Sequence, residues 1–452
     1  MKIGLIQNKS IAGDLSGNLR RIVQSARICL DKGADALVAS AQALDGAFVS
    51  GLAERSSFLL QAQAALAALA AEVSIPLILA SHAAEPGNAS RSPRPYLLCQ
   101  GRVELISDGL VTLPSGKRLF VNVAERPVPP PRGTKCDVIL HLPTAPWTPA
   151  RNWARTASEE AQAQRTAVAI VQGLGCYAGA LMAGGSAAAD ASGKRTLLLP
   201  EFEAAECTWN TGSRRPCAPQ TPPDTLLRAV CFYLREMLQN SGAAGYAVAA
   251  EGARAPLLLA LARLAVGAQK VSAPTWEAPP ALPLAKKRPK LPMPQAAGSA
   301  SAAWQQRLKA LQLTTYAEEH DLLLLNPLTL SDLLLGQYNA PASLLGTFAP
   351  LGDMLESEIE TLRAQAQAAL PPSLRSLVPP CRLLSMEDET ALRLLALENM
   401  SPVEIAVQYG MNETLLRRLV RQLHQAPRHS WPTVLNLHGP RPHIPAEHQL
   451  VE

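Results

Sequence analysis

Cysteine and histidine side chains are the first candidates for chemistry in this sequence, because a thiolate beside an imidazole can act as a nucleophile. Cys136 opens a predicted strand that also contains His141. Residues at these two positions of one strand point to opposite faces, so the spacing does not favour a Cys–His pair. Cys176, in GLGCYAG, lies in a glycine-rich turn without a nearby histidine. We interpret both cysteines as buried or incidental thiols.

The eight cysteines are scattered, with no CxxC pair and no histidine at zinc-ligand spacing. This pattern is typical of reduced thiols in a cytosolic protein rather than of a disulfide framework. The start of the chain lacks the features of a signal peptide. The longest apolar stretch, 255–266, is interrupted by Pro256 and Arg263 and is too short to span a bilayer. We therefore expect a cytoplasmic protein.

The composition indicates a globular chain of two or three domains, since 48% of the 452 residues are hydrophobic and only 17% are charged. The net charge of +5, from 42 basic and 37 acidic residues, is a mild excess. Such a balance predicts neither a nucleic acid partner nor a membrane partner.

The hydrophobic pattern of the first half predicts alternating strands and helices, which is typical of an α/β layered domain. The expected strands are 2–7, 36–39, 76–81, 96–105, 118–123, 138–142, 178–187 and 195–199. The expected helices are 14–32, 59–73 and 159–174, and a hairpin turn is expected at 190–195.

The second half opens after a Pro-, Arg- and Thr-rich segment, 211–224. A helix is predicted at 225–240, and 245–265 is predicted to form a strand, a tight loop and a helix. The Pro-rich stretch 273–301 has no apolar period, which predicts a linker or a mobile loop. Its KKRPK sequence could be a basic recognition tag, but a solvated loop is the simpler interpretation. The remaining residues are predicted to be mostly helical.

Several stretches resemble, in order along the chain, the glutamine-dependent NAD synthetases, which join a nitrilase-type amidase to an ATP-pyrophosphatase ligase. The stretch 3–22 carries a Gln, a Gly-Asp pair and an Asn at the offsets of that family. KGADALVASAQALDG (32–46) resembles its next strand and elbow, and residues 184–203 resemble its Gly-Gly-Ser hairpin. Residues 346–362 and 401–421 resemble parts of the ligase domain.

The resemblance implies an amidase site with a Glu base, a Lys that holds the oxyanion and a Cys nucleophile. The family's Glu lies in an FPEL-type strand end, where this chain has Ala41 beside Gln42. Its Lys lies three residues before a Leu-Pro, which places Leu110 there, and its Cys lies in an ICED-type strand end, where VNVAERP places Ala124. These changes remove the reactive atoms themselves. We predict that the chain has no catalytic residue of the amidase type.

The ligases of this family carry an SGGxDS loop between a strand and a helix, whose backbone N–H groups wrap pyrophosphate. In this chain YAVAAEGARAPLLLALA resembles that strand, loop and helix. The nucleotide-binding positions that the resemblance implies in this loop are vestigial: Glu251, Gly252, Arg254 and Ala255. Glu251 places a negative charge where phosphate would lie. We interpret the segment as an ordinary strand-to-helix turn.

A later stretch, 326–332, resembles the family's TTGNKSE segment, which implies a Thr, a Lys and an acid around nucleotide and magnesium. Leu330 takes the Lys position, whereas Asp332 keeps the acid. Arg307 and Lys309 match the start of a basic family helix, although exposed basic residues are the simpler interpretation. ATP and magnesium are thus the cofactors of the family, and we assign no cofactor and no metal to this chain.

The fold class that the resemblance implies is α/β, with an N-terminal αββα nitrilase-like sandwich and a Rossmann-like adenine-nucleotide hydrolase domain. We expect the sandwich at 1–210, a linker at 211–224 and the second domain at 225–430, with the Pro-rich insert at 273–301. A tail is expected at 431–452.

The family converts deamido-NAD, ATP and glutamine to NAD. We predict that this homologue has lost the amidase triad and the pyrophosphate loop and is a non-catalytic partner or regulator. The alternative is a residual or altered NAD synthetase that uses ammonia. We expect a homo-oligomer, or an assembly with an intact NAD synthetase paralogue, because the apolar helix faces at 226–234 and 415–423 need a surface to pack against.

Overall fold

The computed structural model describes residues 1–47, 50–83, 92–177, 180–213, 217, 224–250, 252–274, 298–336, 348–425 and 433–434. The chain divides into two compact units, Met1–Pro222 and Pro223–Glu452. Among the described residues, no helix is both long and apolar enough to cross a membrane.

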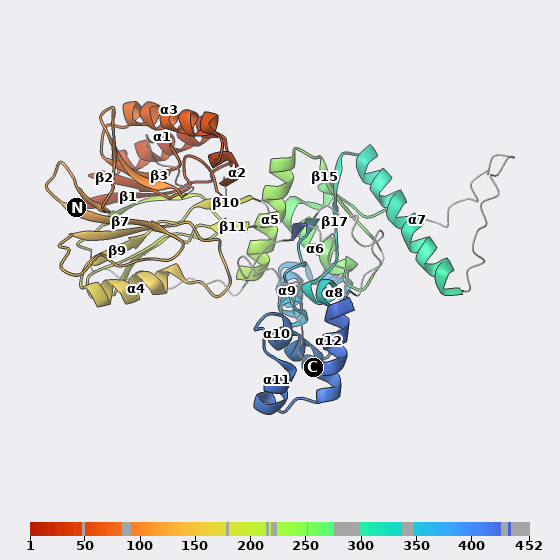
Figure 1. Ribbon diagram of the computed structural model, residues 1–452. Helices are drawn as coiled ribbons and strands as arrows, with labels where there is room; N and C mark the ends of the chain where they lie inside the picture. The colour runs from red at the N-terminus through yellow and green to blue at the C-terminus, as the bar shows by residue number, and fades with distance from the viewer. Residues whose placement is uncertain are drawn as a thin grey trace. The chain divides into compact units, whose positions relative to one another are not determined.

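The N-terminal unit contains two six-stranded sheets, each with three parallel strands at its centre (Figure 1). The first sheet has the order β14 (Ala205–Asn210), β1 (Lys2–Gln7), β2 (Ala36–Ala39), β3 (Leu77–Ser81), β4 (Arg94–Cys99), β5 (Arg102–Leu105). The second has the order β13 (Arg195–Leu198), β12 (Ala187–Ala189), β9 (Ala167–Ile170), β8 (Val138–Pro143), β7 (Arg118–Ala124), β6 (Leu110–Thr112). The parallel strands are β1–β3 in one sheet and β7–β9 in the other.

The sheets face each other across an apolar core, and helices cover their outer faces, so the expected αββα sandwich is confirmed. Residues such as Leu5, Val38 and Leu140 from both sheets form one buried cluster. Helices α1 (Leu15–Asp31) and α3 (Ser56–Glu72) pack on the outer face of the first sheet, and α4 (Trp153–Gln164) packs on the second. A short helix, α2 (Ser50–Ala53), precedes α3.

Buried polar side chains tie the ends of the first strands to distant loops. Gln7 is fully buried; its Nε2 donates to the carbonyls of Pro200 and Glu203 at 2.7 and 2.8 Å. Its Oε1 accepts from the N–H and the hydroxyl of Ser186 at 2.9 and 2.8 Å. Gly184 has a φ of +71°, and a Cβ there would lie 2.3 Å from Gln7 Nε2. The Gln and the Gly-Gly-Ser hairpin noted in the sequence are therefore in direct contact: Gln7 is hydrogen-bonded to Ser186 and packs against Gly184.

Three expected elements of this unit are wrong. The predicted strand 96–105 is a hairpin of β4 and β5, because Gln100 and Gly101 both adopt positive φ. The predicted helix 159–174 ends at Gln164, where Arg165 adopts a left-handed conformation, and β9 follows. Similarly, the expected strand 178–187 is divided: β11 (Ala180–Ala183) pairs with β10 (Leu174–Tyr177), and β12 begins only after Gly184 and Gly185.

The C-terminal unit is built on a parallel sheet, which confirms the Rossmann-like expectation. Its order is β16 (Val271–Ser272), β15 (Gly245–Val248), β17 (Leu322–Leu325), β18 (Phe348–Ala349), β19 (Thr433–Val434). The last three strands were not expected: β17 and β18 are short and lie among helical segments, and β19 falls within the expected tail 431–452. The elements α5 (Thr225–Ser241), α6 (Ala255–Val266) and α9 (Glu356–Ala369) contact one another, while α7 (Gly298–Glu319) packs on β15 and β17.

A helical cluster completes this unit. It consists of α8 (Leu330–Leu335), α10 (Met386–Ala396), α11 (Pro402–Tyr409) and α12 (Glu413–Gln425), which share one apolar core. Two short 3₁₀ turns, η1 (Ala268–Lys270) and η2 (Pro372–Leu377), link other elements. The expected insert 273–301 lies largely outside the described residues, but α7 already begins at Gly298.

The buried hydrogen bonds of Gln7 lead to a prediction about the stability of the protein. Replacing Gln7 with Leu keeps a similar volume but leaves the N–H and hydroxyl of Ser186 without their acceptor. We expect the free energy of unfolding to fall by about 2–5 kcal/mol, measured by urea unfolding followed by circular dichroism. Gln61→Leu, on the exposed face of α3, is the matched control and should change stability by about 0.5 kcal/mol or less. Equal losses in the two variants would contradict the assignment.

Candidate functional site

Two of the three predicted amidase positions, Ala41 and Ala124, lie at the carboxyl ends of parallel strands, where α/β sheets usually carry their sites. Ala41 follows β2 and is fully buried, and Ala124 is the last residue of β7. Thr144 lies between these two ends: its N–H donates to the carbonyl of Ala124 at 3.0 Å, and its carbonyl accepts from Gln42 Nε2 at 3.3 Å. The fold thus links the ends of β2 and β7 through Thr144, and the two positions that the sequence analysis predicted for the Glu and the Cys carry methyl groups.

Leu110, at the position of the family's Lys, lies elsewhere on the second sheet. It pairs with Phe120 in β7, four residues before Ala124, and this offset corresponds to about 13 Å along a strand. The predicted triad positions therefore do not converge on one point, and none of the three side chains can attack a carbonyl, move a proton or hold an oxyanion.

The ring nitrogens of His141 do not contact Cys136. Its Nδ1 lies 3.3 Å from Asn122 Oδ1, and its Nε2 lies 2.8 Å from Oε1 of Glu160 in α4. Both ring nitrogens therefore face oxygen atoms of other residues. Cys136 precedes β8 rather than opening it, and burial, with a smaller contribution from Asp137, raises the pKa of its thiol. This thiol is poorly suited to act as a nucleophile at neutral pH.

A serine, a histidine and an aspartate that the sequence analysis did not single out meet at the ends of β2 and β3. Asp45 Oδ1 accepts from the Ser81 hydroxyl at 2.8 Å, while its Oδ2 accepts from the backbone N–H of His82 at 2.6 Å and lies 2.8 Å from Nδ1 of His82. Ser81 bonds to the carboxylate rather than to the imidazole, so this cluster has the residues of a hydrolytic triad without its geometry. It anchors the turn after β2 to the end of β3.

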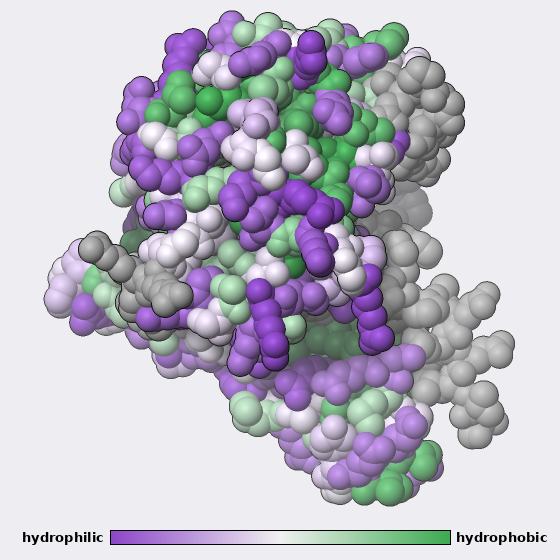
Figure 2. Space-filling view, turned by 90° about the vertical axis from the view of Figure 1, so that its left-hand side faces the viewer, coloured by the Kyte–Doolittle hydropathy of each residue, from purple (hydrophilic) through white to green (hydrophobic). Residues whose placement is uncertain are grey.

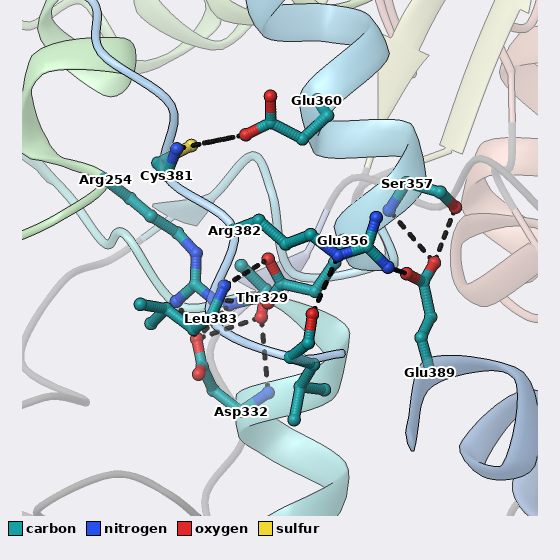
Figure 3. Close-up of polar contacts among 11 residues, drawn as sticks. Arg254, Thr329, Asp332, Glu356, Ser357, Glu360, Cys381, Arg382, Leu383 and Glu389 are labelled. Carbon is teal, nitrogen blue, oxygen red and sulfur yellow. Dashed lines mark hydrogen bonds and ion pairs between the residues drawn. The ribbon is translucent and has the colours of Figure 1, made fainter. Parts of the chain in front are cut away.

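In the C-terminal unit, the strand order β16-β15-β17-β18-β19 places a topological switch point between β15 and β17. Arg254, the N-cap residue of α6, follows β15 in the chain, and its guanidinium points toward Asp332 and Glu356 (Figure 3). Its Nη1 donates to Asp332 Oδ2 at 2.7 Å and its Nη2 donates to Glu356 Oε1 at 2.5 Å. The exposed fractions of Arg254, Asp332 and Glu356 are 7%, 6% and 0%. One buried cation thus faces two buried carboxylates; we call these three residues the Arg254 cluster.

Both carboxylates are also held by their own elements. Thr329 and Asp332 form a capping box at the start of α8, in which Asp332 Oδ2 accepts from the N–H and the hydroxyl of Thr329, both at 2.9 Å. Glu356 begins α9, and its Oε2 accepts from the N–H of Leu383 at 3.3 Å. Burial raises the pKa of Glu356, and the positive charge of Arg254 opposes that effect.

A second set of contacts continues from α9 to the segment before α10 (Figure 3). Glu389 accepts from the backbone and hydroxyl of Ser357 and pairs with Arg382. Glu360 accepts from the N–H of Cys381 at 3.0 Å. Burial, followed by Glu360, raises the pKa of the Cys381 thiol to about 11. These contacts join α9, α10 and the segment between them to the Arg254 cluster.

The other predicted nucleotide positions are not part of this cluster as far as the structure describes them. Gly252 is exposed with a φ of +113°, Ala255 is buried at the start of α6, and Lys309 is exposed on α7. Leu330 is buried in the helical cluster. Glu251 and the side chain of Arg307 lie outside the described residues. Glu356 was missed from the sequence, because an acidic residue in the first turn of a helix is an ordinary capping signal.

ATP and magnesium, the cofactors that the resemblance implies, do not fit the residues present. The cationic side chain at the loop is already paired with two carboxylates, so the cluster has a net charge of −1 and disfavours a polyphosphate. Within the described part of the chain, no group of three or more His, Cys, Asp or Glu residues is placed to hold a metal ion. The segment between β15 and α6 thus has the strand–loop–helix geometry that the sequence predicted.

No protein-family model matches the sequence, and no curated protein matches it. Solved structures do match. The structure of the glutamine-dependent NAD⁺ synthetase from Acinetobacter baumannii in complex with ADP aligns with a TM-score of 0.70 and 15% identity, covering 98% of each chain. A glutamine-dependent NAD⁺ synthetase from Cytophaga hutchinsonii aligns with a TM-score of 0.76 and 10% identity, covering 94% of this chain and 91% of that one. The chain has the fold of these proteins along nearly its whole length, as the sequence resemblance predicted.

Proposed function

We propose that this protein is a non-catalytic homologue of the glutamine-dependent NAD⁺ synthetases that acts as a partner or regulator. The shared fold, which extends along 98% of the chain at 15% identity, supports common ancestry. A shared fold does not by itself imply a shared activity, because activity depends on the site residues. The proposal therefore depends on what occupies the two sites.

The observation that carries the proposal is the Arg254 cluster. A pyrophosphate site needs backbone N–H groups and unpaired positive charge. Here the only described cation of the cluster is engaged by Asp332 and Glu356. An entering triphosphate would meet two carboxylates and would have to break both ion pairs.

The amidase side supports the same conclusion. Ala41 and Ala124 meet near Thr144 but carry no ionisable group, and Leu110 carries none either. In contrast, Gln7, Asn18 and Gly184, which belong to the same family-like stretches, retain buried contacts: Asn18 Nδ2, for example, donates to the carbonyls of Ile11 and Leu44, both at 2.8 Å. Residues that hold the fold are kept, whereas residues that perform chemistry are replaced.

The first functional prediction concerns glutamine. The purified protein should release no ammonia from glutamine above the blank, because no nucleophile lies at the amidase positions. An electrophilic glutamine analogue that labels thiols should modify no cysteine in a glutamine-protected manner, as measured by peptide mass spectrometry. An intact synthetase serves as the positive control. Glutamine-protected, stoichiometric labelling of Cys136 or Cys176 would show that the nucleophile has moved and would overturn the proposal.

The second prediction concerns the nucleotide. A site filled to 100 times its Kd adds about 2.7 kcal/mol of stability, which is a shift of several degrees for a domain of this size. We expect millimolar ATP with magnesium to shift the Tm by less than about 1 °C, because Arg254 is already paired. The competing function, an ammonia-dependent ligase, predicts NAD formation from deamido-NAD, ATP and ammonium, and the same protein should be assayed for it by chromatography. Formation of NAD would establish the competing function instead.

We also propose that the protein assembles with a second copy or with an intact NAD synthetase. The helix faces that first suggested this are covered within the chain, since Leu227, Val230, Leu416 and Leu419 are buried. What supports assembly instead is α11, where Val403 and Val407 are 70% and 79% exposed. Figure 2 shows hydrophobic residues at the lower end of the C-terminal unit, the end that α11 forms in Figure 1.

Light scattering on the purified chain, alone and after co-expression with an intact synthetase, tests this assembly. We expect a mass above the 48.1 kDa of one chain in at least one of the two samples. Val403→Glu combined with Val407→Glu should reduce that mass, because it places charge on the exposed face of α11. A 48.1 kDa species in both samples would exclude the assembly.

A further inference from the structure

The Arg254 cluster contains two carboxylates, each of which is also held by contacts within its own part of the chain. Asp332 is fixed by the capping box with Thr329, and Glu356 is fixed at the start of α9 and by the N–H of Leu383. The carboxylates come from different elements, α8 and α9, and both face the guanidinium of a third, α6 (Figure 3). Without a cation between them, two buried negative charges would face each other, which is strongly unfavourable.

The guanidinium is bound to little else. Nε of Arg254 is buried and has no hydrogen-bond partner among the described residues, so the two carboxylates are the acceptors that hold the side chain. This arrangement resembles an ion between two carboxylate ligands more than a side chain in a branched polar network. Hard divalent cations are held by one or two carboxylates together with water molecules, so the same pair of oxygens could serve such an ion.

We propose that Arg254 is a tethered cation that takes the place of a divalent metal ion between Asp332 and Glu356 and holds α6, α8 and α9 together at the carboxyl edge of the parallel sheet. The inference rests on the proposed function and deepens it, since it identifies what stabilises this edge of the sheet in a homologue that binds no nucleotide. A bound ion is lost by dilution, whereas a side chain is always present at its site. The unaltered chain is therefore independent of divalent metal, and removal of Arg254 uncovers a cation site formed by Asp332 and Glu356.

A double-mutant cycle with Arg254→Ala and Glu356→Gln tests the ion pairing. Removing Arg254 leaves two uncompensated carboxylates, and the Tm should fall by about 6–20 °C. Glu356→Gln leaves Arg254 paired one-to-one with Asp332, and we expect a smaller fall of about 3 °C or less. The double variant should be more stable than Arg254→Ala alone, because it carries one fewer unpaired charge. Additive losses would overturn the inference.

A titration with manganese alone tests the cation site. Millimolar Mn²⁺ should raise the Tm of Arg254→Ala by about 3 °C or more, should leave the unaltered protein unchanged and should have a reduced effect on the double variant. If Arg254→Ala does not fold, Arg254→Gln, which retains a hydrogen-bond donor, replaces it in both experiments. The matched control is Arg417→Ala, which breaks the exposed pair with Glu413 and should respond to Mn²⁺ as the unaltered protein does.

The outcomes separate this inference from the proposed function. If Mn²⁺ changes the Tm of Arg254→Ala and of the unaltered protein equally, the proposal of a tethered cation is overturned, and this holds whether or not ATP binds the protein. Binding of ATP to the unaltered protein overturns the proposed function without any variant being made. Equilibrium dialysis of Mn²⁺ against Arg254→Ala gives a second readout, and we expect one ion per chain, decreasing when Glu356 is replaced.

Discussion

The need to neutralise buried charge determines how the C-terminal unit is held together. Asp332 and Glu356 are buried at the carboxyl edge of the parallel sheet, and Arg254 reaches both from the start of α6. An uncompensated buried carboxylate is costly, so the positions of α6, α8 and α9 depend on one another through a single guanidinium. The contacts of Glu389 and Glu360 extend this dependence to α10 and to the segment around Cys381. Charged side chains from four helices and one intervening segment thus hold this edge of the sheet together.

A related constraint acts in the N-terminal unit, with hydrogen bonds instead of charges. Gln7 pairs with donors and acceptors at 186, 200 and 203, and Asn18 fixes the loop after β1 and the turn after β2. These groups are buried, so their loss would leave several polar atoms unpaired. Ala41, Leu110 and Ala124 carry apolar side chains, which form no hydrogen bonds. The buried polar side chains therefore hold distant segments of the sandwich together, whereas the three predicted amidase positions contribute only apolar side chains.

The local pattern of apolar and polar residues was sufficient to predict most helices and strands of the sandwich. The strand at Lys2–Gln7, the helix at Leu15–Asp31 and the strand–loop–helix around Arg254 follow from apolar periodicity and capping residues. The pattern failed where a short turn divides what reads as one continuous element. The helix α4 ends at Gln164 and β9 begins at Ala167, so that only Arg165, in a left-handed conformation, and Thr166 separate them. The short strands β17, β18 and β19 were missed because their pairing partners are distant in sequence.

The sequence by itself determined which reactive groups are absent. A methyl group at positions 41 and 124 cannot become a base or a nucleophile in any fold, and that conclusion required no coordinates. The sequence also placed Arg254 and Asp332 at positions that resemble a nucleotide site. Only the tertiary structure decided that they form an ion pair, and that Glu356 is the second acceptor. The reason is physical: an ion pair depends on the distance between charges, and residues 254, 332 and 356 come together only because parallel strands bring their carboxyl ends, and the loops that follow, to one edge of the sheet.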